Sequence, residues 1–124
     1  MEILEAFIEG SGDLLRDGQI RYIIHDKAGH SIGALDIFDY DSYLKSGGIG
    51  ILIAEQVDRQ QGFANDALAA FLQHQKHTGE LKLIRSLIHA TNIASIGLFQ
   101  KNGFIKTGVK YYKGREALQF VWEN

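Results

Sequence analysis

The strongest chemical indication in this sequence lies at residues 59–64, which read Arg-Gln-Gln-Gly-Phe-Ala between a strand-like stretch and a helix-like stretch. A helix that begins here presents unpaired N–H groups and a partial positive charge, and both attract phosphate. Gly62 lacks a Cβ and lets the backbone approach an anion closely, and the small Ala64 also helps. Arg59 can add a charge-assisted hydrogen bond to a phosphate oxygen. The alternative is a tight turn without a ligand, and this segment alone leaves both interpretations open.

The same segment argues against two other nucleotide sites. It lacks the Lys-Ser/Thr end of a P-loop. It also lacks the glycine spacing of a dinucleotide fold, so nicotinamide cofactors are disfavoured.

Composition limits the class of protein. A chain of 124 residues predicts one domain, residues 1–124, and the absence of cysteine excludes a disulfide framework, a thiolate zinc site and a cysteine nucleophile. The formal net charge of −2 gives no reason to expect a nucleic-acid partner. The apolar runs are too short to span a membrane and the start carries no basic region, so we predict a cytoplasmic protein without a secretory peptide.

Hydrophobic periodicity predicts the elements that would position this segment. Helices are predicted at 2–9, 62–78 and 92–100. Strands are predicted at 20–25, 31–40, 47–57, 81–89, 104–112 and 116–122. The order α-β-β-β-α-β-α-β-β indicates an α+β fold with a mixed sheet. Strand 47–57, helix 62–78 and strand 81–89 form a βαβ unit, so those two strands should be parallel.

Two blocks of the sequence resemble motifs of the GNAT N-acetyltransferase superfamily. Arg59-x-x-Gly62-x-Ala64 resembles motif A, [Gln/Arg]-x-x-Gly-x-[Gly/Ala]. Residues 92–104, NIASIGLFQKNGF, resemble motif B, which usually reads N-x-x-[A/S]-x-x-L-[Y/F]-x-K-x-G-F. The resemblance covers roughly residues 20–124 and implies the GNAT acyl-CoA N-acyltransferase fold. Segments 32–39 and 48–55 look like the branch that acetylates ribosomal-protein N-termini, antibiotics or polyamines.

The resemblance also implies acetyl-CoA as the donor and places its contacts. N–H groups at 60–64 would cradle the pyrophosphate, with a polar contact from Asn65, and the backbone at 53–55 would pair with pantetheine where two parallel strands separate. Asn92 would hydrogen-bond the pantetheine arm. Ser95 would face the thioester. The predicted acetyl-CoA-binding residues are Ile53, Ala54, Glu55, Arg59, Gln60, Gln61, Gly62, Phe63, Ala64, Asn65, Asn92, Ser95, Phe99 and Lys101.

Family members transfer acetyl directly to an amine, which agrees with the missing cysteine. The implied acceptor is a primary amine, such as a protein N-terminus, a polyamine or an amino sugar. The predicted catalytic residues are Glu55, Ser95 and Phe99. Glu55 is preferred as the base, and its alternative role is a solvated charge at a strand end. Asp36, Asp39 and Asp41 could recognise a cationic acceptor. No metal is predicted, because no acid completes a set with the two histidines at 74 and 77.

Two departures from the family pattern bear on activity. Many members carry tyrosine where this chain has Phe99, and phenylalanine cannot protonate a leaving thiolate. Members usually begin with a strand and a helix, about 30–45 residues, that this chain does not show. A non-catalytic acyl-CoA-binding or dimerisation module is therefore the alternative function. Because a missing first strand would leave a sheet edge unpaired, we also predict a homodimer.

Overall fold

The computed structural model describes the backbone of residues 6–8 together with residues 14–53 and 62–124. In this part of the chain a seven-stranded sheet has the order β1-β2-β3-β4-β5-β7-β6. The strands are β1 (Ala6–Ile8), β2 (Ile20–His25), β3 (Ser31–Asp41), β4 (Ser46–Ile53), β5 (Leu83–His89), β6 (Ile105–Tyr112) and β7 (Arg115–Glu123). The helices are α1 (Leu14–Asp17), α2 (Phe63–Thr78) and α3 (Ile93–Lys101). The predicted α+β fold with a mixed sheet is confirmed.

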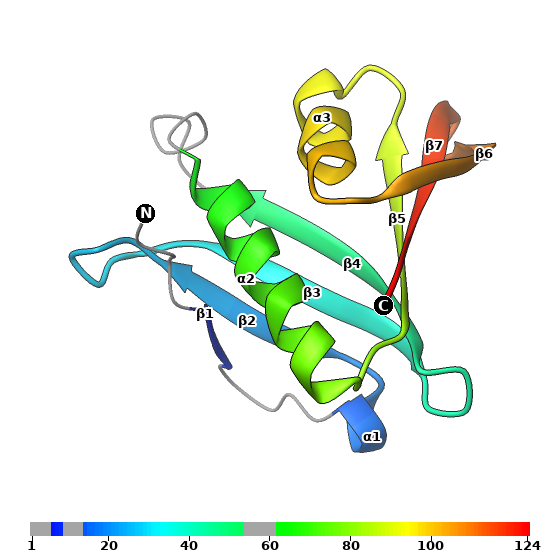
Figure 1. Cartoon of the computed structure of the whole chain (residues 1–124). Helices are drawn as coiled ribbons and strands as arrows, with labels where there is room; N and C mark the ends of the chain where they lie inside the picture. The colour runs from blue at the N-terminus through cyan, green and yellow to red at the C-terminus, as the bar shows by residue number, and fades with distance from the viewer. Residues whose placement is uncertain (1–5, 9–13, 54–61) are drawn as a thin grey trace.

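The helix predicted at 2–9 is wrong where the structure describes it. Residues 6–8 form β1, which pairs antiparallel with β2 (Figure 1). The sequence there has apolar residues that suit either a short helix or a short strand. Pairing with the edge of β2 satisfies backbone groups that a brief surface helix would leave to water, and that long-range contact decides the outcome.

One face of the sheet is covered by α2, as Figure 1 shows. The helix places Ala67, Leu68, Phe71 and Leu72 in the core, at the spacing that one helical face requires. Phe71 meets the ring of Tyr22 from β2 edge to face, with 5.5 Å between ring centroids. This packing fixes α2 against the sheet, and therefore fixes where its first turn lies.

The only parallel strand pair in the described sheet is β4 with β5. It is short: Ser46 pairs with Leu83, and the last pair is Gly48 with Arg85. Beyond that pair β4 continues to Ile53 against β3, whereas β5 continues against β7. The two strands therefore diverge toward their carboxyl ends (Figure 1). In α/β units the carboxyl ends of parallel strands, where the strand order separates, are a common ligand site.

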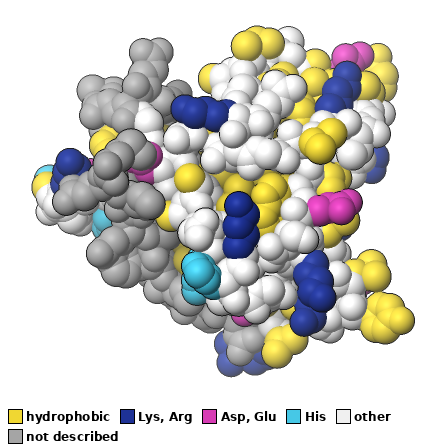
Figure 2. All heavy atoms as spheres, viewed as in Figure 1, with side chains coloured by type: hydrophobic (Ala, Val, Ile, Leu, Met, Phe, Trp, Pro, Cys, Tyr) yellow, Lys and Arg dark blue, Asp and Glu magenta, His cyan; other side chains and the backbone are white. Residues whose placement is uncertain are grey.

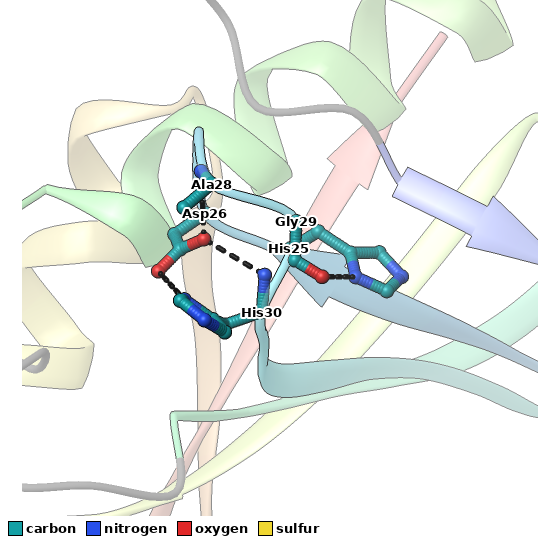
Figure 3. A network of polar contacts seen from close by, with 5 residues as sticks. All are labelled: His25, Asp26, Ala28, Gly29 and His30. Atoms are coloured by element: carbon teal, nitrogen blue, oxygen red, sulfur yellow. Dashed lines mark hydrogen bonds and ion pairs between the residues drawn. The ribbon is translucent and has the colours of Figure 1, made fainter.

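The turn between β2 and β3 is built around Asp26 (Figure 3). One carboxylate oxygen accepts hydrogen bonds from the backbone N–H groups of Ala28 and His30, at 3.0 and 2.9 Å. The other oxygen lies 3.2 Å from Nδ1 of His30. The backbone hydrogen bond from His30 is the main reason why the pKa of Asp26 is lowered, since it favours the charged carboxylate. The strands predicted at 20–25 and 31–40 are thus confirmed, and they pair antiparallel around this turn.

Candidate functional site

A cavity of about 510 Å³ lies between the end of β4, the first turn of α2 and α3. Its lining residues are Ile51, Leu52, Ile53, Gly62, Ala64, Asn65, Asn92, Ala94, Ser95, Leu98 and Phe99. This volume is within the range of small-molecule and cofactor pockets. None of these lining residues is ionisable. The cavity therefore offers apolar walls and neutral hydrogen-bonding groups to a ligand.

The start of α2 forms one wall, and Gly62 sets its shape. Gly62 is the N-cap of the helix with φ 82° and ψ 6°, the left-handed region that favours glycine. Its carbonyl accepts the first helical hydrogen bond, from Asp66 at 3.0 Å. Among the described residues no side chain caps this end. The first N–H groups of α2 thus have no side-chain cap from the described residues, and their contact with an anion stays a prediction.

The start of α3 forms the facing wall. Asn92 is the N-cap, and its side-chain oxygen accepts a hydrogen bond from the Ser95 N–H at 3.2 Å. The carbonyl oxygen of the Asn92 side chain is thus engaged, and Asn92 lines the cavity. Two helices present their first turns to one cavity, so two partial positive charges favour an anionic ligand there.

The inner end of the cavity is apolar. Phe99 is buried, with 4% of its surface exposed, yet it lines the cavity. It meets Phe104 edge to face, with ring centroids 4.9 Å apart and an interplanar angle of 88°. This position supplies an apolar wall, and a phenyl ring has no proton to donate to a leaving thiolate.

The structure brings seven of the predicted binding residues to the cavity: Ile53, Gly62, Ala64, Asn65, Asn92, Ser95 and Phe99. Two others lie elsewhere. Phe63 is half-buried and packs against the core, and Lys101 is exposed at the end of α3. The remaining predicted residues lie outside the described part of the chain: Ala54, Glu55, Arg59, Gln60 and Gln61.

Four lining residues were missed by the sequence reasoning: Ile51, Leu52, Ala94 and Leu98. In a sequence, apolar residues on a strand or helix are interpreted as core residues. These four line the cavity because β4 diverges from β5, which the sequence does not show. Leu98 and Ala94 stand within the second motif, so the motif could have suggested them.

The acidic residues proposed for the acceptor are otherwise engaged or distant. Asp36 forms a bidentate ion pair with Arg21, at 2.7 and 2.8 Å, and this pairing raises the pKa of the Arg21 guanidinium. Asp41 accepts the backbone N–H groups of the next turn. Asp41 pairs with Ser46, at the opposite end of β4 from the cavity, and Asp39 lies beside it in sequence. A role of these carboxylates in binding the acceptor stays a prediction.

Two other kinds of feature are absent from the described part of the chain. Within it no three His, Asp or Glu side chains gather as metal ligands, and no helix is long and apolar enough to cross a membrane. Figure 2 shows the α2 side, where charged side chains are scattered and hydrophobic ones reach the surface between α2 and β5.

Comparison with known proteins identifies the family. Residues 2–105 match the acetyltransferase (GNAT) domain family. No match is found among curated proteins. A chimeric spermidine N-acetyltransferase from Vibrio cholerae and hSSAT superposes with a TM-score of 0.78 at 18% identity, over 89% of this chain and 69% of the other.

Two structures of the Vibrio cholerae enzyme itself are equally similar. The complex with CoA and spermine gives a TM-score of 0.77 at 18% identity, over 89% of this chain and 69% of that one. A dodecameric form in an intermediate state gives 0.77 at 18% identity, over 89% and 67%. At this identity the likeness shows the fold, while the domain match shows the family. The chain belongs to the GNAT acetyltransferase family and is an acetyl-CoA-dependent N-acetyltransferase.

Proposed function

We propose that this protein transfers acetyl from acetyl-CoA directly to a primary amine, with polyamines as the leading acceptors. The observation that carries the proposal is the cavity between two helix N-termini, at the point where β4 and β5 separate. Its neutral lining and exposed helix N–H groups suit the anionic end of the donor. The choice of polyamines rests on the fold shared with spermidine N-acetyltransferases, one of which was solved with spermine.

The residues of this chain divide the work by position. The first turn of α2, from Gly62 to Asn65, would hold the phosphates of the donor with backbone N–H groups. Asn92 would hydrogen-bond the pantetheine arm through its NH₂ group, and Ser95 would face the thioester. The donor supplies that thioester. The acceptor nitrogen attacks its carbonyl carbon, the C–S bond breaks, and the sulfur leaves as a thiolate.

Phe99 can neither accept the proton that the amine loses nor donate one to the leaving thiolate. The attacking amine loses a proton to a base, for which Glu55 is the sequence-predicted group. The thiolate leaves without a proton from position 99, because a phenyl ring has none to give. General-acid assistance contributes about 10²–10⁴-fold where it exists, so turnover without it should be slow rather than absent. Family membership thus favours the enzyme over the non-catalytic alternative.

An acceptor panel tests the proposal. Purified protein is given acetyl-CoA with spermine, spermidine, a peptide with a free N-terminus or an amino sugar, and CoA release is followed. We expect release with the polyamines above the rate without acceptor. Release only with the peptide or the sugar would overturn the polyamine choice. No release with any amine, despite binding of acetyl-CoA, would restore the non-catalytic module.

We also propose that the protein is a cytoplasmic homodimer. In the described part of the sheet β1 and β6 are edge strands, and β6 exposes Ile105, Val109 and Tyr111. Exposed apolar edges favour pairing with another chain. Light scattering should give about twice the monomer mass of 13.9 kDa. A monomer at all accessible concentrations would contradict the dimer.

A further inference from the structure

We propose that Asn102 is a positioning residue that orients the Asn65 side chain, so that the Asn65 NH₂ group is kept for acetyl-CoA. Asn102 follows α3, and Asn65 lies in the first turn of α2 and lines the cavity. The side-chain nitrogen of Asn102 donates to Oδ1 of Asn65 at 2.9 Å. It also donates to the backbone carbonyl of Leu98 at 2.9 Å. The inference rests on the cavity being the donor site proposed above.

The Leu98 carbonyl decides which way both amides point. A carbonyl oxygen can only accept, so the Asn102 atom that faces it must be the nitrogen. That nitrogen carries two hydrogens, and its second hydrogen is directed at Asn65. Asn65 must therefore present its oxygen to Asn102. Its own NH₂ group is left with two hydrogens to donate, and no other described residue accepts them.

The side chain of Asn102 also completes the end of α3. The backbone N–H of Asn102 bonds to the carbonyl of Phe99 at 3.1 Å, which leaves the Leu98 carbonyl without its usual donor four residues later. The Asn102 side chain supplies that donor. One residue thus closes α3 and reaches across to α2, so it ties together the two helices that form the cavity walls.

A correctly oriented NH₂ group contributes most to binding where few other groups in the cavity can donate to the ligand. The lining residues that the structure describes carry no charge, and the first turn of α2 favours oxygen anions. A neutral amide turned the wrong way would point its oxygen at a phosphate and repel it. Asn102 prevents that orientation of the Asn65 amide and adds no charged group near the cavity. The ligand group that Asn65 recognises is accordingly an oxygen acceptor, a phosphate or an amide carbonyl of the donor.

A double-mutant cycle on acetyl-CoA binding tests the proposal. Dissociation constants are measured by calorimetry for the wild type, Asn65→Ala, Asn102→Ala and the double variant. A hydrogen bond to a charged group contributes enough for Asn65→Ala to weaken binding about tenfold or more. Asn102→Ala should weaken binding several-fold. The double variant should bind about as well as Asn65→Ala if the effect of Asn102 on the donor passes through Asn65, as proposed.

The C-terminal Asn124 provides a matched control. Its side-chain nitrogen also donates to two backbone carbonyls, of Gln75 and Leu81, at 2.7 and 3.3 Å. Neither residue lines the cavity. Asn124→Ala should lower the unfolding temperature and leave the dissociation constant unchanged.

Each outcome has one meaning. Additive losses in the double variant, or equal binding by the wild type and Asn102→Ala, would overturn the role of Asn102 while the donor site stands. If Asn124→Ala weakened binding as much as Asn102→Ala, the effect would be general loosening and the inference would also fail. Absence of binding by the wild type would overturn the donor site, and the inference with it.

Discussion

Replacing Gly62 by aspartate should reduce the thermal stabilisation that acetyl-CoA gives to this protein to at most about two-thirds of its wild-type value. Ligand at 100 times its dissociation constant stabilises the wild type by about 2.7 kcal/mol, or roughly 10 °C in unfolding temperature for a domain of this size. Gly62 lines the cavity at the N-terminus of α2, where the donor phosphates would lie. A carboxylate about 5 Å from a phosphate costs roughly 1–3 kcal/mol, depending on the local dielectric. At the same ligand concentration the remaining stabilisation is then about 0.3–1.8 kcal/mol, so the shift should fall to about 1–6 °C.

The folded protein should tolerate this change. A Cβ at Gly62 would meet no atom of the described residues within 4 Å, so the cost is backbone strain alone. Among residues other than glycine, aspartate and asparagine enter the left-handed region most readily, at about 1–2 kcal/mol. A negative charge at a helix N-terminus also offsets part of that strain. Loss of binding would therefore not be loss of fold.

Two control variants separate charge, backbone and position. Gly62→Asn has the same shape as Gly62→Asp without the charge, and should retain much of the thermal shift. Gly79 caps the other end of α2 with φ 66° and equally open space for a Cβ. Gly79→Asp should destabilise the protein and keep the full shift. An unchanged thermal shift in Gly62→Asp would contradict the proposal that the donor phosphates bind at the N-terminus of α2.

The elements that could be predicted from the sequence are those long enough to show a hydrophobic period. The βαβ unit from β4 to β5 was recovered because Leu68, Phe71 and Leu72 repeat at helical spacing between two β-branched stretches. The four-residue helix α1 was missed, because four residues carry no period. The position of β7 between β5 and β6 could also not be predicted from the sequence. A hairpin has the same sequence pattern whichever of its strands joins the sheet.

Several site residues could be predicted because they occupy fixed positions in the two motif blocks. Gly62, which the structure places at a left-handed turn, and Asn92, which it places at a helix cap, were identified in this way. Asn102 was not, because its contact with Asn65 joins residues 37 apart in the chain and depends on how two helices pack. Such contacts leave no local pattern. The apolar cavity wall at 51–53 was not predicted for a similar reason. The sequence of a strand that diverges from its neighbour has the same pattern as that of a strand that remains paired.

Glu55→Gln should lower the rate of acetyl transfer at neutral pH by about 10²–10⁴-fold, the usual contribution of a general base. A primary amine has a pKa of about 10, so at pH 7 only about one molecule in a thousand is free to attack. Glu55 follows the cavity residue Ile53 by two positions in the sequence. If its carboxylate accepts the proton, the reaction draws on the abundant ammonium form. Glutamine keeps the size of the side chain and removes that ability.

The pH dependence of the defect distinguishes a base from a charge that merely stands at a strand end. As pH rises toward the pKa of the amine, the acceptor loses its proton to water, and the variant needs no base. The ratio of wild-type to variant kcat should therefore shrink steadily between pH 7 and pH 10, while the acetyl-CoA thermal shift stays the same in both. Glu123→Gln is the control, because Glu123 is exposed and pairs with Leu83 at the end of β5 remote from the cavity. A Glu55→Gln defect of constant size across this range would assign Glu55 to binding the cationic acceptor, and no defect would leave it a solvated charge.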